Sequence, residues 1–473
     1  MRQTTAIALG VSLAATGPAS AQPAIPVLEQ IYSIQNDAGS NEVAVALAMA
    51  NGRLLVGAPR AFSDIDGVQQ QTGLAYLYDA ATGTELHVLE PARSSAALGQ
   101  PDSFGAAVAL NNNFAVVGAP TRGLQCLGAG ATFWYSPTTG DLKGEVSRAC
   151  GIEQRSGSAV ALSGSRAFVG VPFMGAGVFP VGDVDVFNLS NGASVGDFGP
   201  NNPTFDMQFG AAIAVDGNDV IVGARSGGKL ANDAAVQRAY LFDANTLAQR
   251  VQLTPPPRTP SVESKNDFGV AVSVKDGIAA VGDHGREGPS LDEAVFVFDA
   301  TNGAWLSTFR QPGDGVVVGT DSDFGIAVDM DSGLLVVGAP DATSTSGTSF
   351  GGAAWIFDIA SGEPIAELRP FPEELVGGFG STVAIEGNLV AVSVARFFDA
   401  PEAVFVFDLS RALEGCNSAD FAEPYGQLNA ADLTAFISNL DAAKPSADVA
   451  EPRWTHDFFD LLETLRAFDA GCP

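Results

Sequence analysis

One phrase recurs seven times along the chain and constrains its fold more than any other feature. The clearest copies run over Phe104–Pro120 (FGAAVALNNNFAVVGAP), Phe209–Arg225 and Phe324–Pro340, and weaker copies occupy 42–59, 156–172, 268–284 and 379–395. A period of 52 to 61 residues built of strands and turns indicates a repeat architecture of four-stranded units. The last glycine of the phrase, or its equivalent, stands at Gly57, Gly118, Gly170, Gly223, Gly282, Gly338 and Ser393.

Each copy predicts four strands in an antiparallel meander. Alternating apolar residues after Phe-Gly predict a first strand, and an apolar run such as 115–117 predicts a second. An aromatic run such as Tyr240–Asp243 predicts the third strand, and 85–89 is an example of the fourth. Pairs such as Asn51-Gly52 and Asp276-Gly277 suit the positive φ of a two-residue turn between the first two strands. The sequence therefore predicts an all-β fold, a seven-bladed β-propeller of four-stranded blades.

The two ends of the repeat array indicate how the ring closes. The seventh repeat stops after its third strand at Ala403–Leu409, and Val27–Ile34 precedes the first repeat as a strand without a hairpin partner. We expect 27–34 to complete the last blade, which hides two strand edges. The recurring phenylalanine is expected to fill the wedge between neighbouring blades rather than to bind an aromatic ligand.

These motifs resemble the FG-GAP repeat of integrin α-subunit head domains and related propellers, over roughly 27–409. The resemblance implies a seven-bladed propeller that binds its ligand on the face with the long loops. In that family calcium occupies a nine-residue loop between the first two strands of a blade. Here those connections are short turns such as 216–219, so we expect no calcium in the propeller. The run Asp64–Gly67 lies in a different connection and is interpreted as a turn.

Composition and the N-terminus limit the partners and the destination. The chain has 24 Lys and Arg against 54 Asp and Glu, a net charge of −30, which disfavours nucleic acid and anionic lipid as partners. Arg2, the short apolar run 6–15 and the small residues Ala19–Ala21 have the form of an export signal, with cleavage after Ala21. The apolar run is too short to span a bilayer. We expect a secreted or cell-surface protein without an integral membrane span.

The four cysteines, Cys126, Cys150, Cys416 and Cys472, suit an oxidising destination. Four cysteines allow three pairings, and position in the chain favours Cys126–Cys150 and Cys416–Cys472. Unpaired buried thiols and a metal site are the alternatives, and the metal site is disfavoured because no two cysteines have C-x-x-C spacing.

Residues 413–473 predict a separate small helical domain. The segment 419–440 recurs as 447–468, and each copy is a loop followed by a helix-like apolar stripe. Two such copies are similar to a dockerin, a paired calcium-loop module, which implies calcium and a surface or cohesin-like partner. Because Ala422 and Pro424 stand where that loop has oxygen ligands, a metal-free helix pair closed by Cys416–Cys472 is the alternative. The candidate calcium ligands are Asp420, Glu423, Asp432, Asp448, Glu451 and Asp460.

Strand order sorts the connections into two faces. The turns between first and second strands and between third and fourth strands form one face, the short-turn face. The connections between second and third strands and between successive blades form the long-loop face, and loops on a rigid scaffold are where binding concentrates. The long connections include 60–72, 91–103, 226–237, 254–267, 311–323 and 341–350.

Catalytic signals are few. The three histidines, His87, His284 and His456, show no metal-ligand spacing, although His284 replaces the usual proline of the repeat. Asp102, Asp267 and Asp323 precede their Phe-Gly pairs, where they either line the axis and could do acid–base work or cap hairpins.

The sequence thus predicts a signal peptide at 1–21, a propeller at 22–412 and a dockerin-like module at 413–473. The expected function is that of an exported, non-enzymatic binding or structural protein. A protein or glycan would bind the long-loop face, and the tail would anchor the chain to a surface or assembly. The alternative is an extracellular hydrolase or lyase of polysaccharide, since propellers host both classes.

Overall fold

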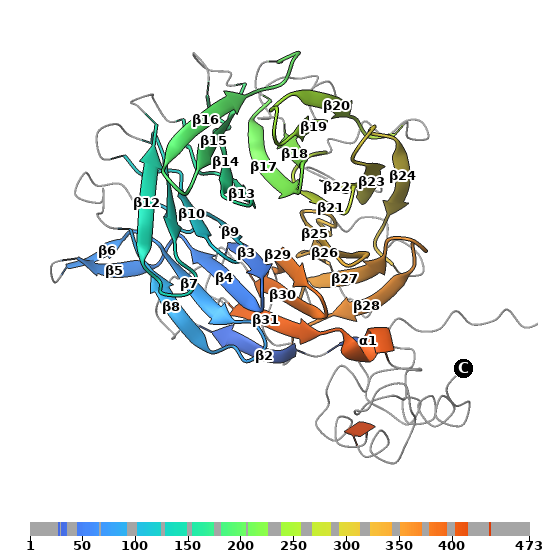
Figure 1. Cartoon of the computed structure of the whole chain (residues 1–473). Helices are drawn as coiled ribbons and strands as arrows, with labels where there is room; N and C mark the ends of the chain where they lie inside the picture. Colours follow the sequence, from blue (N-terminus) through green and yellow to red (C-terminus); the bar gives the residue numbers. More distant parts are fainter. Residues whose placement is uncertain are drawn as a thin grey trace, which may run out of the picture.

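Seven antiparallel sheets of four sequential or ring-closing strands stand around a common axis as the blades of a propeller (Figure 1). This arrangement confirms the all-β, seven-bladed fold predicted from the repeats. The computed structural model of the 473-residue chain describes residues 27–28, 30–35, 45–65, 68–91, 102–123, 128–148, 154–174, 181–204, 207–225, 238–256, 267–284, 293–312, 322–342, 351–370, 378–394, 403–414 and 435–436.

The blades follow one another in chain order, each with its first strand at the axis. Blade 1 consists of β3 (Ala46–Ala50), β4 (Arg53–Ala58), β7 (Leu74–Asp79) and β8 (Glu85–Leu89). Blade 2 consists of β9 (Ala107–Leu110), β10 (Ala115–Ala119), β11 (Ala131–Tyr135) and β12 (Leu142–Ser147). Blade 3 consists of β13 (Val160–Ser163), β14 (Arg166–Gly170), β15 (Val184–Asn188) and β16 (Ala193–Phe198). Blade 4 consists of β17 (Phe209–Asp216), β18 (Asp219–Ala224), β19 (Arg238–Asp243) and β20 (Gln249–Leu253). Blade 5 consists of β21 (Val272–Lys275), β22 (Ile278–Asp283), β23 (Ala294–Asp299) and β24 (Trp305–Phe309). Blade 6 holds β25 (Ala327–Asp331), β26 (Leu334–Ala339), β27 (Ala353–Asp358) and β28 (Pro364–Leu368), and blade 7 holds β29 (Phe379–Glu386), β30 (Leu389–Val394) and β31 (Ala403–Asp408).

The N-terminal segment closes the ring across two blades. Strand β2 (Gln30–Gln35) pairs antiparallel with β31 and is the fourth strand of blade 7. Strand β1 (Val27–Leu28) instead pairs parallel with β28 as a fifth strand on blade 6. The predicted strand 27–34 is therefore divided between two blades, and only its larger part completes the last one.

The recurring phenylalanine lies between blades, as its position in the repeat predicts. Phe104 has no exposed surface and packs in one cluster with Leu77 of blade 1 and Phe133 of blade 2. Its ring meets that of Phe133 edge-on at a centroid distance of 5.3 Å. The same residue is fully buried in blades 4 to 7, as Phe209, Phe268, Phe324 and Phe379.

The glycine of the VGAP element is required by an approach of one blade's backbone to the next. A Cβ on Gly118 would lie 2.1 Å from the carbonyl oxygen of Gly157 in blade 3, closer than any real Cβ contact. The same contact recurs at six junctions, with distances of 2.0 to 2.1 Å, between Gly57, Gly118, Gly170, Gly223, Gly282 or Gly338 and the next blade's Gly105, Gly157, Gly210, Gly269, Gly325 or Gly380. Ser393 of blade 7 takes this position at the junction with blade 1, where no FG pair follows.

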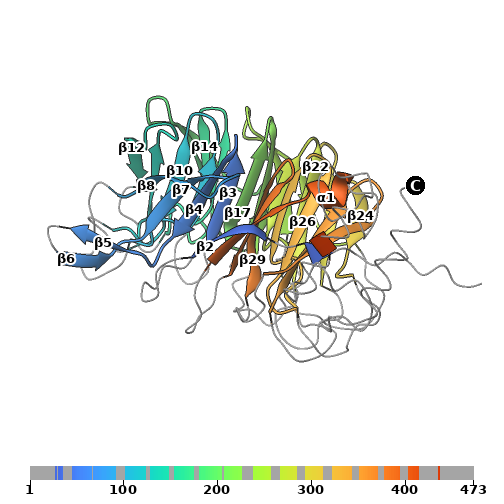
Figure 2. The ribbon, with the colours of Figure 1, turned by 90° about the horizontal axis from the view of Figure 1, so that it is seen from below.

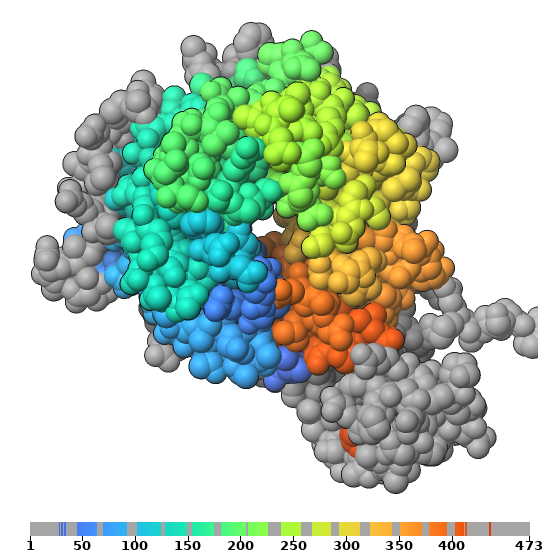
Figure 3. All heavy atoms as spheres, viewed as in Figure 1, coloured from blue at the N-terminus to red at the C-terminus, as the bar shows by residue number. Residues whose placement is uncertain are grey.

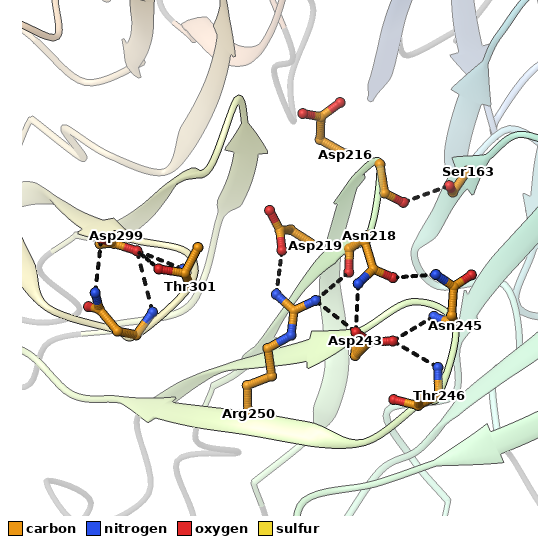
Figure 4. A network of polar contacts seen from close by, with 12 residues as sticks. Ser163, Asp216, Asn218, Asp219, Asp243, Asn245, Thr246, Arg250, Asp299 and Thr301 are labelled. Atoms are coloured by element: carbon orange, nitrogen blue, oxygen red, sulfur yellow. Dashed lines mark hydrogen bonds and ion pairs between the residues drawn. The ribbon is translucent and has the colours of Figure 1, made fainter.

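The short-turn face is tied together from blade to blade. The last residue of a first strand reaches the turn of the next blade: Ser163 donates to the Gly217 carbonyl at 2.9 Å, and Asp216 accepts from the Asp276 amide at 2.9 Å. Farther from the axis, Asp243 at the end of β19 accepts from Thr246 N at 2.8 Å and from Arg250 at 3.0 Å (Figure 4). These contacts explain why each aromatic strand ends in a turn-capping polar residue.

Two additions extend the propeller. The connection between β4 and β7 contains a hairpin, β5 (Phe62–Ile65) and β6 (Val68–Gln71), that projects from the rim of the ring (Figures 1 and 2). After β31 the short helix α1 (Ser410–Glu414) packs through Ala412 on the cluster that contains Leu28 and Leu409. In the tail only 435–436 is described; both residues are helical and Phe436 is buried. The predicted helical domain otherwise lies outside the described residues.

Candidate functional site

The described residues of the long-loop face are mainly the strand ends from which its connections begin. Charged side chains gather there at three places: around Arg122 in blade 2, around Arg148 between blades 2 and 3, and around His284 between blades 5 and 6. In each place the sequence departs from the small or apolar residues that neighbouring repeats carry.

The first cluster is a buried ion pair. The side chains of Arg122 and Asp102 are 2% and 0% exposed, and Arg122 Nη1 lies 3.2 Å from Asp102 Oδ2. Glu145 approaches Arg122 Nε at 3.1 Å, and the guanidinium lies over the ring of Phe133. Removing one partner of such a pair leaves an uncompensated buried charge, so the pair fixes the start of the connection after β10.

The second cluster joins the outer strand of blade 2 to blade 3. Arg148, directly after β12, binds both carboxylate oxygens of Asp185 on β15, with distances of 2.6 and 2.5 Å. Its Nη2 also lies 3.3 Å from Asp183. Burial, reinforced by the negative charge of Asp197, raises the pKa of Asp183 to about 6. A carboxyl group that titrates near neutral pH can give or take a proton under physiological conditions.

The third cluster, around His284, lies where other junctions between blades have a main-chain hydrogen bond. At the junctions of blades 2 with 3 and 3 with 4, Ser156 N donates to the Ala129 carbonyl at 3.1 Å and Phe209 N donates to the Val181 carbonyl at 2.8 Å. A glycine follows each acceptor, and Gly130 and Gly182 form bridges with the next blade. Blade 5 has Glu293 at this glycine position.

The carboxylate of Glu293 takes over the role of the missing backbone bridge. It accepts hydrogen bonds from Asp323 N at 3.0 Å, from Phe324 N at 3.2 Å and from the Ser322 hydroxyl. All three donors belong to the turn that begins blade 6. The junction of blades 5 and 6 is therefore held by an ionisable side chain where comparable junctions use the main chain.

His284 adds a second ionisable link across the same junction. Its Nδ1 lies 3.1 Å from Asp323 Oδ1 in blade 6, and its Nε2 lies 3.8 Å from Asp267 Oδ2 in blade 5. Asp283, completely buried at the end of β22, stands where the other repeats have alanine or valine. The three groups place an imidazole among carboxylates at the root of several long connections.

The first strands of the blades lie nearest the hollow at the centre of the ring, and one of them carries an unusual carboxylate (Figures 1 and 3). Asp329 on β25 occupies a position that is alanine in five blades and Ser273 in blade 5. It accepts from Ser273 Oγ at 3.2 Å and from Ile385 N at 3.0 Å, so it links blades 5, 6 and 7. Burial raises the pKa of Asp329 to about 6.

The structure separates the three aspartates that precede Phe-Gly pairs. Asp267 and Asp323 meet at His284, whereas Asp102 pairs with Arg122 in another blade. The histidine at an outer strand, His87, approaches the Thr138 carbonyl at 3.1 Å. The candidate calcium ligands Asp420, Glu423, Asp432, Asp448, Glu451 and Asp460, the histidine His456, and the cysteines Cys126, Cys150, Cys416 and Cys472 all lie outside the described residues.

Sequence reasoning missed Glu293, Arg148 and Asp329. Each could have been found by aligning the repeats, because Glu293 occupies a glycine position and Asp329 an alanine position. By the register of the third and fourth strands, Arg148 stands where four other repeats have proline, at Pro91, Pro200, Pro255 and Pro370.

Comparison with known proteins leaves the chain without an assigned family. No protein-family model matches it, and no curated protein sequence is similar to it. The resemblances to FG-GAP repeats and to dockerins therefore remain predictions. Within the described ranges, no three His, Cys, Asp or Glu side chains are grouped so that they could hold a metal ion. No helix in the described part of the chain has the length and apolar character needed to cross a membrane.

Proposed function

We propose that this chain is an exported binding or structural protein of the FG-GAP type, in which the long-loop face of the propeller binds a protein or a glycan. The observation that supports this proposal is the unequal construction of the two faces. The short-turn face is closed by two-residue turns and blade-to-blade hydrogen bonds such as that from Ser163 to Gly217. On the other face, ion pairs such as Arg148–Asp185 hold the roots of long connections, which is how a rigid scaffold presents variable loops.

The tail is proposed to anchor the protein to a surface or assembly as a dockerin-like module, with calcium in its two loops or with a Cys416–Cys472 disulfide in their place. Its repeated loop–helix pattern supports this proposal. Treatment of the whole protein with EDTA, and separately with a reductant, distinguishes the two forms. Unfolding of the tail by EDTA alone would support calcium, and unfolding only after reduction would support the disulfide.

The binding proposal is tested with three forms of the full exported protein. One form has 226–237 replaced by a short Gly-Ser linker, one has an insertion of Gly-Ser at Asn112–Asn113 on the short-turn face, and one is unchanged. Each is measured against a glycan array and against immobilised fractions of secreted protein. We expect binding by the unchanged form and by the short-turn variant, with loss in the long-loop variant. Equal binding by all three forms contradicts the assignment of the face.

One observation favours the enzymatic alternative. Asp183 beside Arg148 has a pKa of about 6 and lies at the root of a long connection, as a general acid or base for glycan cleavage would. Purified wild type and Asp183→Asn are assayed on a panel of polysaccharides, with Asp299→Asn on the short-turn face as the control. Release of reducing ends or unsaturated products by the wild type and Asp299→Asn, but not by Asp183→Asn, would support an enzyme. Absence of release by the wild type contradicts it.

A further inference from the structure

We propose that the junction between blades 5 and 6 is a pH-sensitive latch, in which the imidazolium of His284 holds the first turn of blade 6 against blade 5. The proposal does not depend on what the long-loop face binds. It rests on the geometry of His284 and on the contrast between this junction and the others.

The contrast begins with the main chain. Where blade 2 meets blade 3, the Ser156 amide and the Ala129 carbonyl form a hydrogen bond that does not titrate. Where blade 5 meets blade 6, the corresponding amide, Phe324 N, binds the carboxylate of Glu293. A hypothetical Cβ on Gly325 lies 3.0 Å from the Ala294 carbonyl, whereas one on Gly157 lies 2.6 Å from the Ala131 carbonyl. The first turn of blade 6 is thus held by a carboxylate at the position where the first turn of blade 3 is held by a main-chain carbonyl.

His284 is the member of this junction whose charge changes near neutral pH. A charged imidazolium donates from both ring nitrogens, so it can bind Asp323 at 3.1 Å and attract Asp267 at 3.8 Å at the same time. In the neutral form one nitrogen has only a lone pair. If Nδ1 keeps its hydrogen for Asp323, the lone pair of Nε2 faces the acceptor oxygen of Asp267, and one favourable contact is lost.

Among the described residues, the charged groups at the long-loop ends of the elements around His284 are carboxylates: Asp267 before β21, Asp283 at the end of β22, Glu293 before β23, Asp323 before β25 and Asp341 after β26. The cation of β21, Lys275, lies at the opposite end of that strand, where it pairs with Asp331 at 3.2 Å. The amide of Asp341 also binds the Ser322 carbonyl at 3.1 Å, which ties the same turn to blade 6. The attraction between the imidazolium and these carboxylates is lost as pH rises through the titration of His284.

The latch acts on one short segment. Asp323, Phe324 and Gly325 begin blade 6, and Ile326 N closes their turn by binding the Asp323 carbonyl at 3.1 Å. The segment 313–321 leads directly into this turn, and 285–292 leaves from His284. A change in the charge of His284 consequently alters how firmly two long connections are rooted.

Hydrogen exchange of the full protein tests the latch, because the chain contains a matched internal control. The amides of 323–326 are followed by mass spectrometry at pH 5.5, 7 and 8.5, with correction for the intrinsic exchange rate. The turn 103–106 at the start of blade 2 is the reference. We expect protection of 323–326 relative to 103–106 to fall about tenfold between pH 5.5 and 8.5, the factor that corresponds to one charge-assisted hydrogen bond.

Two variants assign the effect to His284. His284→Gln should show the weaker protection at every pH, and His87→Gln, at an outer strand, should behave as the wild type. The ring-proton resonance of His284 should titrate with the same midpoint as the change in protection. A ratio that does not vary with pH in the wild type, or that varies equally in His284→Gln, overturns the proposal. If His284→Gln does not fold, the wild-type profile and the resonance midpoint decide the question.

Discussion

The junction of blades 2 and 3 and the junction of blades 5 and 6 occupy equivalent places in the ring and are built differently. In the first, Gly118 and Gly130 of one blade approach Gly157 and Ser156 of the next, and the Ser156 amide donates a main-chain hydrogen bond to the Ala129 carbonyl. In the second, Gly282 keeps its close approach to the backbone of blade 6. The positions of Pro120 and Gly130 are taken by His284 and Glu293.

The difference teaches that the two parts of each junction have different physical requirements. The approach of the VGAP glycine leaves no room for a Cβ, so it recurs at six junctions. The contact farther toward the long-loop face needs only an acceptor for one amide, and a carbonyl or a carboxylate can supply it. At the junction of blades 5 and 6, the carboxylate of Glu293 supplies this acceptor.

The largest expected effect tests the part that the two junctions share. Gly118→Ala and Gly282→Ala would each place a methyl group about 2 Å from a carbonyl oxygen of the next blade, so blades must separate. We expect each to lower the free energy of unfolding by about 3 kcal/mol or more, measured by urea denaturation. Gly164→Ala, at a turn with φ of 57° and open space, is the control and should cost about 1 kcal/mol. A mild effect of Gly282→Ala alone would mean that the junction of blades 5 and 6 yields more easily.

Glu293→Gly makes the junction of blades 5 and 6 resemble that of blades 2 and 3 at this position. It removes the acceptor of two amides and a hydroxyl and restores the residue found in blades 1, 2, 3 and 6. We expect a loss of about 2 kcal/mol in unfolding free energy because the Phe324 amide is left without this acceptor. Glu363→Gly, in a turn of the opposite face, controls for the added glycine. An unchanged stability would show that the main-chain bridge re-forms and that the carboxylate is dispensable.

Asp329→Ala tests whether the negative charge of Asp329 lowers the free energy of unfolding. The pKa of this carboxyl is raised to about 6, so the folded state holds its proton to higher pH than the unfolded state. Its contribution to stability therefore falls as pH rises from about 4 to about 6 and stays constant above. We expect the variant to gain on the order of 2 kcal/mol relative to wild type across that window, measured by denaturation at pH 4, 5, 6 and 7.

The control for this pH series has the opposite sign. Hydrogen bonds from Thr301 lower the pKa of Asp299 on the short-turn face, so its contribution is present at neutral pH and is lost on acidification. Asp299→Ala should therefore lose stability relative to wild type at pH 7 and approach it at pH 3. A difference between Asp329→Ala and wild type that is the same at pH 4 and pH 7 would contradict the assigned pKa direction.

The smallest expected effect lies on the short-turn face, where blade-to-blade links are numerous. Glu386 of blade 7 accepts from the amides of Asn51 and Gly52 in blade 1, the latter at 2.9 Å. Blade 1 itself has Ala50 at the corresponding position, so an alanine fits the strand. We expect Glu386→Ala to cost about 0.5–1 kcal/mol in thermal denaturation. A loss above 2 kcal/mol would show that closure of the ring depends on this carboxylate as well as on β2.

Much of the fold could be predicted because the same pattern of strands and turns occurs seven times in the sequence. The Phe-Gly pair, the turn pairs and the aromatic runs are local signals, and their recurrence removes the ambiguity that any one copy would have. The path of the N-terminal segment was less predictable. Gln30–Gln35 and Val27–Leu28 are both extended and apolar enough for a strand, and only the geometry of the ring places them on different blades.

The candidate site could be predicted in part. His284 stood out as a departure from the repeat, and Asp267 and Asp323 stood out by position, but nothing in the sequence joins them across a blade boundary. The contact of His284 with Asp323 spans 39 residues, and that of Arg148 with Asp185 spans 37. Pairing of this kind depends on the rotation from one blade to the next, which periodicity does not contain.

By itself, the sequence determined the blade: which residues form each strand, where glycine is obligatory and which face carries long connections. These follow from local backbone preferences and from the alternation of side chains, which act within one repeat. Only the tertiary structure decided what each unusual residue does, since it brings Glu293 beneath the Phe324 amide and His284 beside Asp323. The physical reason is that a charged group acquires its role from the groups around it, and in a ring of radial sheets those groups come from the neighbouring blade.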